Sequence, residues 1–301
     1  MDYFIDSLGL VMGGDKVSLA PGLQIRDRMI FDHANGARHN ITSTTRDVLM
    51  MLGRGVEISQ WHAYAAAVRF TDKEWLDLIA FLNSIGGIQI HRSWSAQFLM
   101  SMHRIQWQVQ GVSMQTHAVR NSATIKGLAY AISLAMGQLA ALTVIVSMLS
   151  IYSGLAEYAA LAVYSIGILW ITTFVHEYSH IAISKTSNHI PAVIVRGLRI
   201  GIIHHQLSRK RNILSALMGP LMGIGFATFL GLAGWLAQSA VIIQSCFVVS
   251  VFHALSWLPS YGDGRVLKNE FTKFRKRGNY EKTSAAIIER KRTSRSSQRP
   301  I

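Results

Sequence analysis

The second half of the chain is dominated by long runs of apolar residues separated by short polar connectors. Each run is close to the roughly 20 residues that an α-helix needs to cross the apolar core of a bilayer. Four spans are predicted, at about 127–151, 158–184, 213–237 and 239–258. We therefore expect a mixed fold whose membrane part, residues 127–267, is α-helical.

The first 92 residues show the shorter periods of a small soluble α+β domain. Apolar and polar residues alternate between residues 19 and 41, which predicts strands, and Asn35-Gly36 is typical of a hairpin turn. Thr71 and Glu74 have the spacing of a helix capping box. Three helices and a return strand are predicted to follow the hairpin, near residues 44–52, 57–68, 72–85 and 88–90.

Three further segments connect or follow these parts. Residues 93–126 form an amphipathic connector, and the helical spacing within 93–110 predicts either a membrane-surface helix or a core helix of the soluble domain. Residues 190–207 have the pattern of two short strands about a turn, either dipping into the membrane or lying on its cytoplasmic side. Residues 268–301 form a basic tail that is expected to be solvated or to bind lipid headgroups.

Composition and charge favour a membrane protein and argue against nucleic acid as a partner. Hydrophobic residues make up 50% of the 301 positions and charged residues 15%, which is unusual for a soluble chain. Six basic residues lie in 185–212, and 12 basic and four acidic residues lie in 259–301. Basic segments beside uncharged spans predict a multi-pass protein of the cytoplasmic (inner) membrane with both termini cytoplasmic. Residues 1–126, with 12 basic and 10 acidic residues, are nearly neutral and offer no basic surface for nucleic acid.

The clearest chemical motif is His176-Glu177-Tyr178-Ser179-His180, an H-E-x-x-H pattern near the end of the second predicted span. Residues four apart share one face of a helix, so His176 and His180 can reach one Zn²⁺ with Glu177 beside it. The pattern arises by chance in roughly one such sequence in a hundred. A catalytic zinc also needs a third protein ligand and an open position for water.

Asp263 is the best candidate for the third ligand. It follows Pro259, which is expected to end the fourth span, and it lies between Gly262 and Gly264, which free the backbone to turn a carboxylate back toward the metal. The ends of the second and fourth spans lie on the same side of the membrane in this topology. The alternative is an ordinary Asp-Gly turn at a helix exit.

The membrane half resembles the site-2 protease family of intramembrane zinc metalloproteases. The H-E-x-x-H motif is followed by Ala216-Leu217-Met218-Gly219-Pro220-Leu221-Met222, which is similar to the family's Gly-Pro-Leu segment, and then by a Pro…Asp-Gly motif. The 190–207 hairpin falls where the family places a membrane-associated sheet. The resemblance implies one zinc ion per chain held by His176, His180 and Asp263, with Glu177 as the catalytic carboxylate.

Two departures from the family pattern lie between residues 256 and 264. Ser256 stands where the family usually has Asn, and Gly262 stands before Asp263 where the family has Leu and one more residue between the Pro and the Asp. His253, one turn before Ser256, can supply the missing polar group, either by steadying an oxyanion or as a metal ligand. The alternative for His253 is a helix–helix hydrogen bond.

The soluble domain resembles a winged-helix module and the PqqD-like peptide-recognition domains of peptide-maturation systems. The resemblance rests on the opening at residues 19–22, on Asn40-Ile41-Thr42 leading to Val48-Leu49, and on the closing helix. It implies peptide binding by strand addition. The alternative is an unrelated α+β domain.

These patterns predict a zinc-dependent intramembrane endopeptidase that acts on a membrane-embedded or membrane-delivered peptide, in peptide maturation or signalling. The hairpin is expected to hold an extended substrate, through Val193, Val195, Ile200 and Ile202. One alternative is a non-catalytic membrane peptide receptor with a structural or vestigial zinc site. Another is a metal or small-solute transporter, although a single histidine cluster and the lack of inverted repeats argue against it. The sequence leaves the oligomeric state open.

Overall fold

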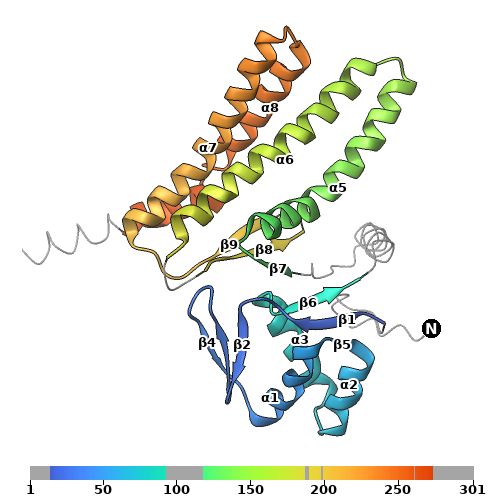
Figure 1. The fold of residues 1–301 in the computed structure, drawn as a ribbon, viewed down its shortest axis with the longest axis vertical. Coiled ribbons are helices and arrows are strands. Elements are labelled where there is room, and N and C mark those ends of the chain that lie inside the picture. Colours follow the sequence, from blue (N-terminus) through green and yellow to red (C-terminus); the bar gives the residue numbers. More distant parts are fainter. Residues whose placement is uncertain (1–13, 93–117, 187–189, 198, 261, 274–301) are drawn as a thin grey trace, which may run out of the picture.

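The computed structural model describes residues 14–92, 118–186, 190–197, 199–260 and 262–273. A bundle of long helices stands on one side and a small α+β domain on the other, with a three-stranded sheet between them (Figure 1). The helix expected within 93–110 and most of the basic tail lie outside the described residues. Residues 262–273 are helical.

The soluble domain contains two antiparallel sheets of three strands each. One has the order β5-β1-β6 and the other the order β2-β3-β4. The strands are β1 (Lys16–Leu19), β2 (Leu23–Arg26), β3 (Met29–Asp32), β4 (Arg38–Asn40), β5 (Val56–Glu57) and β6 (Ile88–His91). The predicted hairpin at Asn35-Gly36 is confirmed: β3 pairs with β4, and Gly36 takes the positive φ of 74° that the turn requires.

The three predicted helices of this domain are also confirmed. They are α1 (Ser43–Met50), followed by the short η1 (Met51–Arg54), α2 (Ile58–Ala67) and α3 (Asp72–Ser84). The capping box of α3 is present, and hydrogen bonds from the backbone and side chain of Thr71 hold the pKa of Glu74 below its usual value. Trp61 is fully buried against Trp75, and its indole N–H donates to the carbonyl of Val48 at 2.8 Å. The assignment to the winged-helix or PqqD-like type stays a prediction.

Four long helices form the bundle: α5 (Ile125–Tyr152), α6 (Ala156–Ser184), α7 (Arg209–Leu236) and α8 (Ala240–Leu255). Among the described residues, α6 and α7 are long and apolar enough to cross a membrane, and α5 qualifies if its two halves, bent by 45°, are one span. Large apolar side chains point outward from the bundle, such as Leu149, Phe229 and Phe247 with 62–70% of their surface exposed. These features indicate a membrane protein. Four spans stay a prediction, because α8 has only 16 residues.

The predicted 190–207 hairpin is confirmed as β8 (Ala192–Arg196) and β9 (Arg199–Ile203). The sequence did not reveal its third strand, β7 (Ala118–Ser122), which lies within the segment interpreted as a connector. The order β7-β8-β9 makes β8 the central strand and leaves β9 at an edge. This sheet packs against α5 through Val193 and Val195.

The soluble domain is attached to this sheet by buried polar contacts. The Arg120 guanidinium on β7 makes two hydrogen bonds to the Asp32 carboxylate at the end of β3, one of them 2.9 Å long, and both side chains are at most 2% exposed. The Asn83 side chain accepts a bond from the backbone N–H of Ala118, and Arg196 donates to the carbonyl of Ser84 at 3.0 Å. Paired buried charges at a contact fix its geometry, because either one left alone would be costly. The domain therefore has a defined position beside the bundle.

Candidate metal and catalytic site

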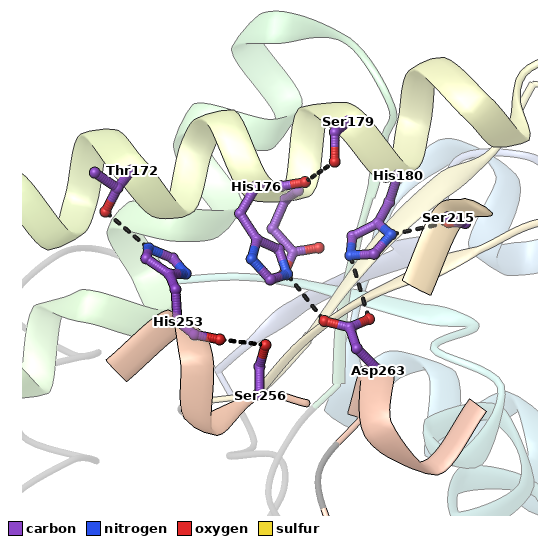
Figure 2. Close-up of polar contacts among 9 residues, drawn as sticks. Thr172, His176, Ser179, His180, Ser215, His253, Ser256 and Asp263 are labelled. Atoms are coloured by element: carbon purple, nitrogen blue, oxygen red, sulfur yellow. Dashed lines mark hydrogen bonds and ion pairs between the residues drawn. The ribbon is translucent and has the colours of Figure 1, made fainter. Parts of the chain in front are cut away.

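Two histidines of α6 and one aspartate beyond α8 converge inside the bundle. His176 Nε2 lies 3.2 Å from Asp263 Oδ2, and His180 Nε2 lies 3.4 Å from Asp263 Oδ1 (Figure 2). The three side chains are between 8% and 16% exposed. One ligand atom from each lies within 4.8 Å of the other two, so the group could hold a metal ion. The predicted proximity of Asp263 to both histidines is thus present in the fold.

Tight turns bring Asp263 back to α6. The α8 helix ends at Leu255, ahead of Pro259, and the backbone N–H of Gly264 donates to the carbonyl of Ser256 at 3.0 Å. A Cβ at Gly264 would lie 2.1 Å from the carbonyl oxygen of Leu258, so this contact admits only glycine. Neither Gly262 nor Gly264 takes a positive φ, and both lie in the helical segment 262–273, so the expected role of the two glycines in freeing the backbone is not confirmed. The α8 helix also stops earlier than Pro259 would require.

The surroundings of the two histidines suit a metal ion. Ser215 Oγ lies 2.9 Å from His180 Nδ1, so that nitrogen can donate to it and leave Nε2 free as a ligand. His176 Nδ1 is buried and has no hydrogen-bond partner in the described part of the chain. Two imidazoles, one carboxylate and an adjacent open space form a donor set that zinc commonly takes in hydrolases. The residues present therefore fit the metal that the motif predicts.

Glu177 lies beside this group in a cavity of about 760 Å³. Its side chain is 13% exposed, and its Oε1 is 4.0 Å from His176 Nε2. Apolar residues of α5, β9 and α8 line this cavity, among them Met136, Leu139, Ile200, Ile202 and Phe252. Polar and charged residues line it as well, including Asn212, Asn269, Glu270 and Lys273. A carboxylate, a metal-binding group and apolar side chains thus line the same cavity.

The remaining predicted site residues fall into two groups. Ile200 and Ile202 line the cavity, whereas Val193 and Val195 are buried in the core against α5. His253 and Ser256 line the cavity but lie outside the group of three metal-binding side chains. His253 makes a helix–helix hydrogen bond to Thr172, and Ser256 Oγ donates to the main-chain carbonyl of His253 at 2.7 Å.

Glycines of α7 shape the site, and the sequence analysis missed their role. A Cβ at Gly219 would lie 2.4 Å from His180 Nε2 and 2.9 Å from His176 Nε2, and a Cβ at Gly223 would lie 2.8 Å from the His253 ring. Ser215, Gly219 and Gly223 follow one another at four-residue spacing, so they face the histidines from one side of α7. Small residues at this spacing within an apolar span were the available signal, because they mark close helix contacts.

Gly219→Ala is expected to weaken zinc binding about 10- to 100-fold, because the added methyl enters the space between the two Nε2 atoms. Competition with a chromophoric zinc chelator measures this change. Gly225→Ala on the same helix is the matched control, since no atom lies within 4 Å of its Cβ position. Equal zinc affinity in both variants would show that Gly219 of α7 does not lie against the zinc-binding position.

Comparison of the chain with models of known protein families, with curated proteins and with solved structures finds no match.

Proposed function

We propose that the protein is a zinc-dependent endopeptidase of the cell membrane that hydrolyses a peptide bond in a membrane-embedded or membrane-delivered peptide. The observation that carries the proposal is the approach of Asp263 to within 3.4 Å of both histidine Nε2 atoms, with Glu177 in the same cavity. Three ligands and a free carboxylate next to them are the components of a zinc hydrolase. The four-span topology, with the site toward the cytoplasmic face, is part of this proposal.

His176, His180 and Asp263 would hold the ion. When bound, zinc lowers the pKa of water toward ~7 and polarises a carbonyl oxygen. Ser215 would orient His180 by accepting a hydrogen bond from its Nδ1–H, which leaves the Nε2 lone pair available to the ion. The two carboxylates have different proposed roles. Asp263 contacts both histidines and would be the ligand, while Glu177 faces the cavity and would be the base.

Glu177 is the residue that moves the proton. Its carboxylate accepts a proton from the attacking water and then returns it to the leaving nitrogen of the cleaved bond. Apolar side chains such as Leu139 and Ile202 also line the cavity, where they offer a surface for the apolar side chains of a membrane-delivered peptide.

The substrate is proposed to bind as an extended strand along β9. A helical peptide bond is already hydrogen-bonded and shielded, so a membrane-delivered peptide has to unwind before cleavage. Of the two predicted hairpin strands, β9 lies at an edge of the sheet and β8 does not. Ile200 and Ile202 of β9 also line the cavity. The soluble domain, fixed to the same sheet through Arg120 and Asp32, is proposed to recruit the peptide.

Metal removal tests this function. The purified full-length protein in detergent is expected to contain one zinc ion per chain and to cleave members of a library of fluorophore-quencher peptides with apolar segments. Treatment with a chelator should abolish cleavage, because the ion supplies the activation of water, and added zinc should restore it. Metal content is read by mass spectrometry for zinc, iron and manganese, since two histidines and a carboxylate also bind iron. A protein that holds zinc but cleaves no peptide would favour the receptor instead.

A further inference from the structure

His253 is held beside the three metal-binding side chains by contacts with α6 and α7. It lies in the last turn of α8, is 3% exposed, and stacks on His176 with ring centroids 5.2 Å apart and an interplanar angle of 26° (Figure 2). Gly223 of α7 makes room for the ring. An ionisable side chain buried in a membrane helix and fixed in this way is functional by default.

The position of the proton on His253 follows from its partner. The hydroxyl of Thr172 lies 2.9 Å from the carbonyl oxygen of Ile168 on its own helix, to which it donates its single hydrogen. The same oxygen lies 2.9 Å from His253 Nε2. With its hydrogen given to a carbonyl of its own helix, the hydroxyl accepts there, which places the ring hydrogen on Nε2. In the neutral ring, Nδ1 then bears the lone pair. Among the described residues Nδ1 has no hydrogen-bond partner.

This tautomer decides between the roles that a histidine can take here. A neutral ring with the hydrogen on Nε2 has no donor left to steady an oxyanion, and His253 lies outside the group of three that could hold the metal. What it offers at the cavity wall is an acceptor. The abundant donor in an extended peptide is the main-chain N–H.

We propose that His253 is a substrate-binding residue whose Nδ1 accepts a hydrogen bond from a main-chain N–H next to the cleaved bond. The proposal rests on the peptidase function proposed above. It also defines the substrate class: the peptide has a free N–H at this position, so proline and other N-substituted residues are excluded there. Thr172 acts through His253 as a positioning residue, because its hydroxyl fixes the tautomer.

A scan of ester-substituted peptides tests this contact. Replacing one main-chain amide at a time by an ester removes a single N–H from a peptide that the wild-type protein cleaves. At one position beside the cleaved bond, wild-type kcat/KM is expected to fall about 10-fold, the usual effect of one neutral hydrogen bond. His253→Phe should lose about 10-fold on the all-amide peptide and nothing further on that ester. Proline at the same position should be a poor substrate for the wild-type protein.

Two further measurements separate this role from a structural one. His253→Phe should keep the wild-type zinc content and melting temperature. Thr172→Val should lower kcat/KM several-fold, whereas Thr228→Val on α7, an exposed threonine that also bonds a carbonyl of its own helix, should not.

If the losses from His253→Phe and from the ester multiply at every position of the scan, His253 only links two helices and does not bind substrate. The same conclusion follows if a lower melting temperature accounts for the whole effect of His253→Phe. A wild-type protein that cleaves no all-amide peptide would overturn the peptidase function and this contact with it.

Discussion

Glu177→Gln is expected to lower peptide cleavage at least about 1,000-fold while the protein keeps its zinc. Glutamine has nearly the same shape as glutamate but cannot accept a proton, so the step that activates water is lost. The structural cost should be small, because the carboxylate faces the cavity and its closest charged contact, with His176, is 4.0 Å long. The measurement is turnover of a fluorogenic peptide by variant and wild-type proteins with equal zinc content.

A matched control exists on the same helix. Glu157→Gln makes the identical change in the first turn of α6, at an exposed position far along the helix from the motif. It should leave both activity and zinc content unchanged. Full activity of the purified Glu177→Gln variant would eliminate the proposed mechanism.

Asp263→Ala is expected to remove zinc from the protein, unlike Glu177→Gln, because it deletes a proposed metal ligand and not the proposed base. The two histidines alone should bind zinc at least about 100-fold more weakly, since loss of even an outer-shell partner costs 10- to 100-fold. Cleavage should therefore disappear together with the metal. Zinc stoichiometry after dialysis against a weak chelator, measured by mass spectrometry, gives the direct result.

His204→Ala provides the comparison for metal content. His204 lines the same cavity but is not a member of the metal-binding group, so its removal should leave one zinc ion per chain. Unchanged zinc in the Asp263→Ala variant would show that another side chain completes the site, with His253 as the first to test.

Local patterns were sufficient to predict most of the regular elements, with β7 as an exception. The turn at Asn35-Gly36, the capping box from Thr71 to Glu74 and the 190–207 hairpin are encoded by a few neighbouring residues, and all three are present. His176 and His180 could be placed on one face of a helix for the same reason, because a spacing of four residues fixes their relation regardless of the rest of the fold.

The approach of Asp263 was predicted with less local information. Its proximity to the histidines followed from the expected side of the membrane and from a family resemblance, since no periodic pattern connects residues so far apart in the chain. The end of α8 was less well predicted. The α8 helix stops at Leu255 because the chain turns there to carry Asp263 back, which an apolar run extending to residue 258 does not reveal.

By itself, the sequence determined the helices of the soluble domain, the apolar bundle and two ligands of the candidate metal site, because each depends on interactions between near neighbours in the chain. Only the tertiary structure decided that β7 completes the central sheet, that Arg120 meets Asp32, that Gly219 lies against the two motif histidines, and that His253 contacts Thr172. These features depend on the packing of distant segments. The structural role of a short polar strand, of a glycine within a span or of a buried histidine depends on the atoms that the fold places beside it.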